Sequence, residues 1–206
     1  MKTTVYLVRH GETEWNKEGK FQGCTDIHLS DNGMNQAGYL KKALKDQFDL
    51  IYTSPLKRAV HTAEIICEDE KNQKPIILTD IREIAFGEWE GLTIHQIREQ
   101  YPKEYKVWRY DDENANLVGG DLSIKNASIR AKNTILSLVR EFPGKRIAIV
   151  AHGGIIKASL IGIFDWKMSM YHKFFLGNTS ITKLTFGESL NPILVYLNNT
   201  SHLPKE

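Results

Sequence analysis

The chain has 206 residues, of which 41% are hydrophobic and 25% are charged, a composition typical of a globular protein with its own apolar core. Its formal net charge is +2, with 27 basic and 25 acidic residues, so no strong field of one sign favours nucleic acid or an anionic membrane as partner. Because the first residues lead directly into a short apolar run, we expect no leader, and no apolar run of the given sequence reaches membrane-spanning length. We expect a cytoplasmic protein that binds neither nucleic acid nor membrane.

Two cysteines, Cys24 and Cys67, lie far apart in the sequence. Two isolated cysteines match no metal-ligand spacing and form no disulfide framework. We therefore expect two thiols, one partly exposed and one on the buried face of a helix.

Strand and helix patterns alternate in the first third of the chain. Val5–Val8 is a short run of β-forming apolar residues and predicts a buried strand. Ser30 opens a predicted helix in which apolar residues recur every three or four positions, namely Met34, Ala37, Leu40 and Leu44. Asp49–Thr53 predicts the next strand. Ser54 and Pro55 then predict a helix start, with the serine as cap and the proline in the first helical position.

The alternation continues later in the chain. Apolar positions from Ile124 to Leu138 predict a long helix, which Pro143 and Gly144 end. Arg146–Ala151 is the most apolar strand candidate of the chain. A second helical pattern follows directly after it.

The last elements complete the expected fold. Gly153–Ile163 has the helical pattern, and Ser180–Phe186 with Ile193–Leu197 predicts two strands joined by a turn. This order of elements predicts an α/β fold: a mainly parallel sheet flanked by helices on both faces, with a late hairpin near one edge.

The stretch from about residue 93 to 121 is polar, aromatic and only weakly periodic. Its aromatic residues include Tyr101, Tyr105, Trp108 and Tyr110. One interpretation is a pair of surface helices whose aromatic side chains pack on the core. The other is a helical cap segment over an active site. Because no linker or repeat is visible, we expect residues 1–206 to form a single domain that includes this segment.

Chemically versatile residues follow three of the predicted strands. Arg9 and His10 follow the first, Arg58 lies in the first turns of the helix after the second, and His152 follows the strand at 146–151. Ligands of open α/β sheets bind at the carboxyl ends of the strands. We therefore expect two histidines and two arginines to converge on one rim of the sheet.

This set of residues indicates phosphoryl transfer. A phosphoryl group in transfer carries dispersed negative charge, which the paired donors of arginine match. A neutral histidine is a competent nucleophile, and a second, protonated histidine would donate to the phosphate oxygens. The sequence has neither a P-loop nor a carboxylate cluster that would hold magnesium. We therefore expect no metal and no organic cofactor.

The segment Leu7–Asn16 resembles the signature of the histidine phosphatase superfamily, the phosphoglycerate-mutase-like group. Further blocks resemble the family in the same order, at residues 21–37, 53–63, 83–91 and 151–154. The resemblance covers nearly the whole chain and implies a metal-independent phosphatase of the small phosphatase group.

The resemblance also implies roles for individual residues. His10 would accept the phosphoryl group, and Glu83 would protonate the leaving oxygen. The oxygens of the phosphoryl group would be held by Arg9, Arg58 and His152. The rest of the phosphate and substrate pocket would come from Asn16, Gln22, Gly23 and Gly153. Glu83 has a second interpretation as a surface glutamate in an acidic turn.

One segment departs from the family pattern. Small phosphatases of this group often carry Gly-Glu-Ser before the long helix, where this chain has Gly120, Asp121 and Leu122. We therefore carry over no substrate contacts from this region.

The resemblance implies a phosphomonoesterase that acts on small phosphorylated metabolites through a covalent phosphohistidine. A cofactor-dependent phosphoglycerate mutase is the alternative, although those enzymes are longer and have a different pattern after the acid than Glu83–Gly87. A non-catalytic phosphate-binding regulatory module is a third, disfavoured because every core residue is present. Phosphoglycerate-like acids, sugar phosphates and α-ribazole phosphate all remain candidate substrates, and an edge hairpin leaves room for a homodimer.

Overall fold

The computed structural model describes residues 2–68, 74–110, 117, 119–121 and 123–204. Within these residues six strands form one sheet in the order β3-β2-β4-β1-β5-β6. The strands are β1 (Thr3–Arg9), β2 (Leu50–Thr53), β3 (Ile76–Ile77), β4 (Arg146–Ala151), β5 (Ile181–Phe186) and β6 (Pro192–Asn199). The helices are α1 (Glu14–Lys17), α2 (Asp31–Leu44), α3 (Lys57–Cys67), α4 (Ile94–Gln100), α5 (Pro102–Tyr110), α6 (Ile124–Glu141) and α7 (Gly153–Ile163). The part of the chain that the structure describes also has three short 3-10 helices, η1 (Thr79–Ile81), η2 (Gly87–Trp89) and η3 (Met168–His172).

The sheet is mixed, with its parallel part on one side. β4 pairs in parallel with β1 and with β2, and β2 pairs in parallel with β3. β5 runs antiparallel to β1, and β6 closes the edge antiparallel to β5. The predicted mainly parallel sheet with a late edge hairpin is confirmed. The short strand β3 was not predicted.

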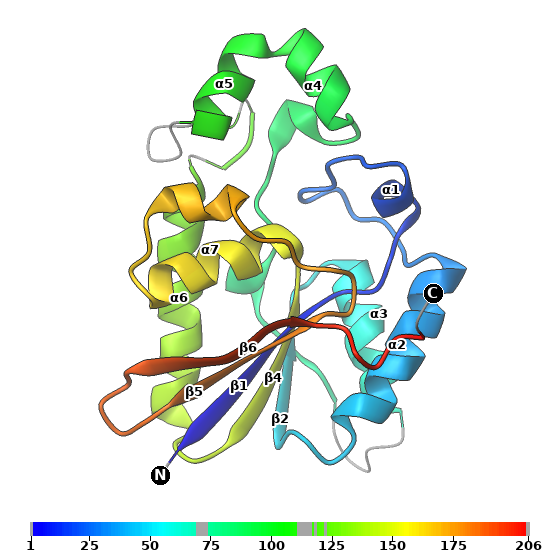
Figure 1. The fold of residues 1–206 in the computed structure, drawn as a ribbon. Coiled ribbons are helices and arrows are strands. Elements are labelled where there is room, and N and C mark those ends of the chain that lie inside the picture. The colour runs from blue at the N-terminus through cyan, green and yellow to red at the C-terminus, as the bar shows by residue number, and fades with distance from the viewer. Residues whose placement is uncertain (1, 69–73, 111–116, 118, 122, 205–206) are drawn as a thin grey trace.

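Helices cover both faces of the sheet because side chains along a strand point alternately to opposite sides. In β1, Val5 and Leu7 pack in one apolar cluster with residues of α6 and α7, while Tyr6 and Val8 pack in the other with α2 and α3. The ribbon shows these two helical layers on opposite sides of the sheet (Figure 1). β4 lies between β1 and β2, and Ile147–Ala151 are buried. A central strand covered on both faces has few positions for polar residues, which explains its nearly continuous apolar run.

The predicted cap of α3 is wrong. The helix begins at Lys57, and the residue before it, Leu56, makes no capping hydrogen bond with its side chain. The hydroxyl of Ser54 instead lies 2.6 Å from Nε2 of His152. A serine before a proline is a common helix start, but here the side chain binds a residue that follows the neighbouring strand β4 and is far away only in the sequence. Ser30, in contrast, caps α2 as predicted by accepting a hydrogen bond from the Gly33 amide at 3.1 Å.

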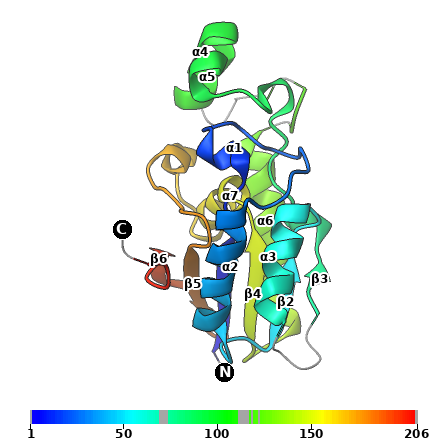
Figure 2. The same cartoon turned by 90° about the vertical axis from the view of Figure 1, so that its right-hand side faces the viewer.

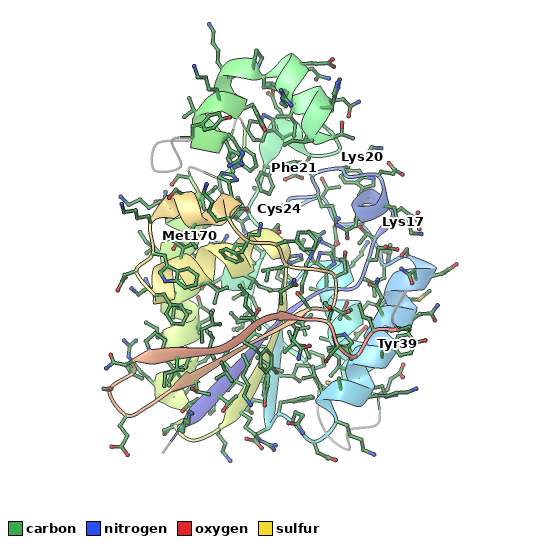
Figure 3. The ribbon with its side chains drawn as sticks, viewed as in Figure 1. Lys17, Lys20, Phe21, Cys24, Tyr39 and Met170 are labelled. Carbon is green, nitrogen blue, oxygen red and sulfur yellow. The ribbon has the colours of Figure 1, made fainter. Side chains whose placement is uncertain are left out.

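α4 and α5 lie beyond the carboxyl ends of the parallel strands, at the same end of the molecule as α1 (Figures 1 and 2). Trp108 of α5 is buried, and its ring lies 5.6 Å from Trp89 and 5.8 Å from Phe21, edge to face. Phe21 points toward this aromatic group from the segment after α1 (Figure 3). Tyr110, at the end of α5, is exposed. Of the segment at 93–121, residues 111–116 and 118 lie outside the described residues. Residue 122, in the segment that departs from the family pattern, also lies outside them.

Two further expectations concern the cysteines and the membrane. Cys67 is buried on α3 and Cys24 is partly buried, as the sequence predicts. None of the described helices combines the length and the apolar character that crossing a bilayer requires.

Candidate active site

Three neighbouring strands deliver the polar residues at the rim of the sheet. Arg9 of β1 lies opposite Ala151 of β4, so His10 and His152 leave adjacent strands at the same level. The amide of His10 donates to the carbonyl of Ala151 at 2.9 Å, and the amide of Ser54, after β2, donates to Val150 at 2.9 Å. Pairing between parallel strands therefore extends one residue past their ends and fixes the backbone at the rim.

His10 is held in one tautomer. Its ring is 3% exposed, and its Nδ1 lies 2.6 Å from the carbonyl oxygen of Gly11. Because a carbonyl oxygen only accepts, the ring hydrogen must lie on Nδ1, which leaves the lone pair on Nε2. Burial, followed by the charges of Arg58 and Arg9, lowers the pKa of His10 well below its usual value. The ring is thus neutral at physiological pH and has a free nucleophilic nitrogen.

His152 faces His10, with the two ring centroids 5.1 Å apart. Arg58 Nε donates to Nδ1 of His152 at 3.2 Å, so the hydrogen of this ring lies on Nε2 and is donated to Ser54 Oγ at 2.6 Å. Burial, followed by the charge of Arg58, lowers the pKa of His152 well below its usual value. The expectation that this histidine is protonated is therefore wrong for the site as it stands: the ring is neutral, and its Nδ1 is an acceptor.

Arg58 is fully buried and anchored on three sides. Besides its bond to His152, Nη1 donates to the carbonyl of Thr25 at 2.8 Å, and Nη2 donates to that of Gly23 at 2.7 Å. Gly23 has a φ of +52°, and a Cβ there would lie 1.9 Å from a carboxylate oxygen of Glu90. Only glycine fits this turn. Its carbonyl and that of Thr25 hold the guanidinium plane in place.

Arg9 is the second arginine of the site and is partly buried. Its Nη1 donates to the carbonyl of Leu176 at 2.5 Å. Its Nε is buried and has no hydrogen-bond partner among the described residues. Gly153 lies beside this group, since a Cβ there would come within 3.4 Å of Nε. Burial lowers the pKa of Arg9 to about 10, which still leaves it charged at neutral pH.

Glu83 is 7% exposed and is not a surface residue. Its Oε1 accepts from the amides of Ile84 at 3.0 Å and Ile155 at 2.7 Å, and its Oε2 accepts from the amide of Gly154 at 2.9 Å. Two of these amides belong to the first turn of α7, where a helix has unpaired N–H groups and attracts negative charge. A Cβ on Gly154 would lie 2.7 Å from Oε1. Glycine at this position therefore lets the carboxylate approach the helix end.

The remaining predicted residues line the same pocket, which has a volume of about 390 Å³. Asn16 accepts from the hydroxyl of Thr13 at 3.1 Å and from Nδ2 of Asn178 at 3.1 Å. Gln22 is 8% exposed, and its Oε1 has no partner among the described residues. Eight of the nine predicted residues thus line one cavity. The ninth, His152, is fully buried and accepts a hydrogen bond from Arg58 of the cavity wall.

Several residues of the site were not predicted. Lys157 and Tyr171 line the pocket, and Ser54 binds His152. Lys157 is the one charged residue of α7, four positions after Gly153. That spacing places it on the same helix face as Gly153 and is the sequence signal that would have revealed it.

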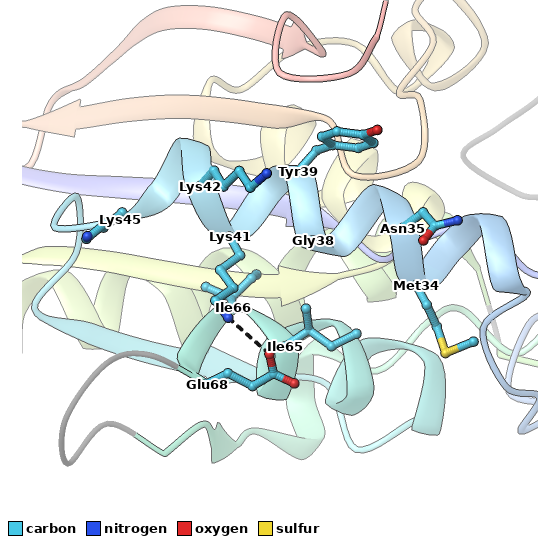
Figure 4. A pocket seen from close by; sticks show the side chains of 10 residues that line it. All are labelled: Met34, Asn35, Gly38, Tyr39, Lys41, Lys42, Lys45, Ile65, Ile66 and Glu68. Carbon is cyan, nitrogen blue, oxygen red and sulfur yellow. Dashed lines mark hydrogen bonds and ion pairs between the residues drawn. The ribbon is translucent and has the colours of Figure 1, made fainter.

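A larger cavity of about 540 Å³ lies between α2 and α3 (Figure 4). It is lined largely by residues such as Met34, Tyr39, Lys42 and Ile65, and none of the nine predicted residues reaches it. Size alone therefore does not identify the site. Among the described residues, the cavity at the rim is the one in which the neutral ring of His10 lies with the buried Arg58 and the partly buried Arg9.

Comparison with known proteins assigns the family. The family model of the histidine phosphatase superfamily (branch 1) matches residues 5–200. The chain belongs to the histidine phosphatase superfamily. This histidine phosphatase is 33% identical over 200 residues to phosphoserine phosphatase 1 of Hydrogenobacter thermophilus, a match that covers 97% of this chain and 93% of that protein.

Solved structures agree with this assignment. Phosphoserine phosphatase of Entamoeba histolytica has a TM-score of 0.91 and 39% identity, covering 98% of this chain and 100% of that one. A mutant of that protein was solved with phosphoserine, and the protein was also solved with 3-phosphoglyceric acid. A 2,3-bisphosphoglycerate-dependent phosphoglycerate mutase of Treponema denticola is 36% identical, but the match covers only 78% of this chain and 77% of the mutase. The predicted α/β fold and phosphatase activity on phosphate monoesters are confirmed, and the mutase and regulatory alternatives are not favoured.

Proposed function

We propose that this histidine phosphatase hydrolyses phosphomonoesters of small metabolites by carrying the phosphoryl group on Nε2 of His10. The observation that carries the proposal is the hydrogen bond between His10 Nδ1 and the Gly11 carbonyl. It leaves the Nε2 lone pair available in a cavity that also contains Arg9, Arg58 and Glu83.

In the first half-reaction, the Nε2 lone pair forms a bond to phosphorus while the ester P–O bond breaks. The electron pair of that bond goes to the leaving oxygen, which takes a proton from Glu83 and departs as an alcohol. The phosphorylated ring keeps its hydrogen on Nδ1 and becomes positively charged. The Gly11 carbonyl, 2.6 Å away, stabilises this charge.

In the second half-reaction, water attacks phosphorus and the N–P bond breaks. The electron pair returns to Nε2, and the Glu83 carboxylate takes the proton that the water loses. Inorganic phosphate leaves, and His10 is restored to its neutral form. Glu83 thus alternates between acid and base, and the amides of Gly154 and Ile155 keep it in place in both steps.

The phosphate oxygens bind to the two arginines. Arg9 Nε is a buried donor without a partner among the described residues, and such a group costs about 1 to 3 kcal/mol unless a ligand pairs with it. Arg58 keeps further N–H groups beyond the three that bind His152, Thr25 and Gly23. We assign Asn16, Gln22, Gly23 and Gly153 to the walls of this phosphate and substrate pocket.

His152 acts at the phosphate only if it takes up a proton. Its Nδ1 accepts from Arg58, so donating to a phosphate oxygen requires a proton on that nitrogen. The negative charge of an arriving phosphate raises the tendency of the ring to bind one. Until then, His152 fixes the orientation of the Arg58 guanidinium.

The candidate substrates are small phosphorylated acids such as phosphoserine and 3-phosphoglycerate, because the similar protein of Entamoeba histolytica binds both. A pocket of about 390 Å³ is large enough for such molecules. We propose that residues 93–121 form a cap within a single domain of residues 1–206. The contact between Trp108 and Phe21, whose rings lie 5.8 Å apart, supports this, since Phe21 also lines the pocket.

A screen of phosphorylated metabolites for release of inorganic phosphate tests the proposed function. At least one small monoester should be turned over well above p-nitrophenyl phosphate. No release from any of these compounds would refute the proposal and favour a regulatory module. Adding 2,3-bisphosphoglycerate with 3-phosphoglycerate should yield phosphate rather than 2-phosphoglycerate, and a predominance of the latter would indicate a mutase.

Some predictions are independent of the chemistry. The cytoplasmic location, the lack of nucleic-acid and membrane partners and the homodimer remain sequence-based predictions. β6 supports the last of these because it forms the edge of the sheet, and its Ile193 and Val195 are exposed.

A further inference from the structure

The active-site cavity contains more positive charge than a phosphate and a catalytic acid require. The charged residues that line it are Arg9, Lys20, Arg58, Lys157 and Glu83. The two arginines match the two negative charges of a phosphomonoester dianion. Lys20 already pairs with Glu18, at 2.5 Å between Nζ and Oε2. Lys157 is the remaining cation.

Lys157 is partly buried and is held by aromatic rings. Its Nζ lies 5.5 Å from the ring centroid of Tyr171 and 5.6 Å from that of Phe174. Among the residues that the structure describes, no carboxylate lies within ion-pair distance of this ammonium group. Burial, followed by the charge of Arg9, lowers the pKa of Lys157, whereas Glu83 acts in the opposite direction. A partly dehydrated ammonium group therefore lies close to the reacting centre.

The position of Lys157 in α7 points it at the leaving group. Helical side chains lean toward the helix N-terminus, and the N-terminus of α7 holds Gly153, beside Arg9, and Gly154, beside Glu83. Lys157 lies four residues after Gly153 and three residues after Gly154. Its Nζ lies over the ring of Tyr171, and the hydroxyl of Tyr171 lies next to Gly154, as does the Glu83 carboxylate. This places Lys157 near the carboxyl group that we assign to the leaving oxygen.

We propose that Lys157 is a specificity residue that binds a carboxylate on the leaving group, so that the preferred substrates are phosphomonoesters of small hydroxy acids. The proposal rests on the proposed function and names the residue that would recognise its acidic substrates. Lys157 touches neither the phosphorus nor the leaving oxygen in this account. Its loss should therefore affect acidic substrates selectively.

Two esters that differ by one group test this proposal. O-phosphoserine and O-phosphoethanolamine share the ester and the ammonium group, and only the first has a carboxylate. A charge-assisted hydrogen bond predicts that kcat/KM for phosphoserine exceeds that for phosphoethanolamine by roughly 10- to 100-fold. Lys157→Met keeps the apolar stem and should remove this advantage, because it lowers kcat/KM far more for phosphoserine than for phosphoethanolamine. Lys157→Arg should keep most of it.

Lys125→Met is the matched control, since Lys125 is exposed on α6, and it should match the wild type on both esters. Melting temperatures verify that each variant is folded. Equal turnover of the two esters by the wild type would overturn the proposal without any variant. Equal losses on both esters in Lys157→Met would also overturn it, because they would assign the lysine to the phosphate or to Glu83.

A binding measurement separates this proposal from the proposed function. If no ester, p-nitrophenyl phosphate included, releases phosphate, the proposed function fails. Calorimetry with His10→Ala protein then decides the role of Lys157. Phosphoserine should bind at least roughly 10-fold tighter than phosphoethanolamine, and adding Lys157→Met should remove the difference. Equal affinities in the His10→Ala protein would contradict the carboxylate site.

Discussion

Replacing Arg58 by lysine should impair both catalysis and stability while keeping the charge. The guanidinium donates to three different acceptors, His152 Nδ1 and the carbonyls of Thr25 and Gly23, from a side chain that is 0% exposed. Lysine has one nitrogen on a flexible stem and cannot reproduce this planar set of donors.

The structure sets the size of both effects. If the lysine reaches one of the three acceptors, two buried acceptors lose their donor, at about 1 to 3 kcal/mol each. The free energy of unfolding should fall by about 2 to 6 kcal/mol. Turnover should fall by roughly 10²-fold or more, since the paired donors to the transferring phosphoryl group are lost.

Urea unfolding and steady-state kinetics measure the two effects, with kinetics run where the variant is fully folded. Arg146→Lys is the control, because Arg146 pairs with Asp49 at the opposite end of β4 and its side chain is 42% exposed. An exposed pair of this kind contributes at most about 1 kcal/mol, so this variant should have wild-type turnover. Wild-type turnover in Arg58→Lys would refute the role assigned to the arginine and leave it as a residue that shapes the start of α3.

Three further predictions concern the acid, the metal and pH. Glu83→Gln should lower turnover of alkyl phosphates by roughly 10²- to 10⁴-fold. It should lower turnover of p-nitrophenyl phosphate far less, because nitrophenolate leaves without a proton. Equal losses on both substrates, together with a lowered melting temperature, would make Glu83 a structural residue. Activity should survive prolonged dialysis against EDTA, and a loss restored by magnesium, manganese or zinc would contradict the charge balance proposed for the site. Burial lowers the pKa of His10 and of His152 in the folded state. Below the unfolded pKa of about 6.5, the unfolded chain therefore binds a proton at each ring while the folded protein does not. As the pH falls, the free energy of unfolding should decline by up to about 1.4 kcal/mol per pH unit for each ring. Urea titrations at pH 7.5 and pH 5.5 test this, and a His10→Gln variant should show a smaller decline; equal stabilities at the two pH values would mean that the rings are not buried neutral.

The convergence of the two histidines was predictable from sequence for a physical reason. β1 and β4 are buried on both faces, so their apolar runs are visible without a structure. In a parallel sheet such strands end at the same rim, and the observed pairing of Arg9 with Ala151 follows. The polar residue after each strand is then placed with little further information.

The position of Glu83 was not predictable from the pattern of residues, and the resemblance alone pointed to it. Its carboxylate binds the amides of Gly154 and Ile155, more than seventy residues later in the chain. Nothing in the local sequence around Glu83 indicates this, because it follows a short 3-10 helix rather than a strand. Bonds between a side chain and a distant helix end depend on the packing of the whole chain.

Ser54 and His152 show how local rules mislead at a functional site. The sequence at Ser54 and Pro55 fits a helix start, but the hydroxyl binds His152 from an adjacent strand end. The protonation of His152 was misjudged for a related reason. Its neutral state follows from burial and from Arg58, and neither is visible until the tertiary structure is known.

Asp121 belongs to the segment that departs from the family pattern, and it has a structural role in this chain. Oδ1 of Asp121 accepts from Arg82 Nη2 at 3.0 Å, and Oδ2 accepts from the amide of Ala85 at 3.0 Å. These two bonds secure the residues on either side of Glu83. Asp121 therefore helps to fix the segment that carries Glu83, the acid that we propose, and the sequence of residues 120–122 did not indicate this contact.

The central claim is that His10 carries the phosphoryl group, and trapping that group tests it most directly. The enzyme is mixed briefly with ³²P-labelled phosphoserine and quenched in alkali, where phosphohistidine is stable and phosphoserine is not. Proteolysis and mass spectrometry should locate the label on a peptide that contains His10, with acid lability as a second criterion, and His10→Ala protein should remain unlabelled. Wild-type labelling of the His10→Ala protein, or label on any other residue of the wild type, would contradict the account.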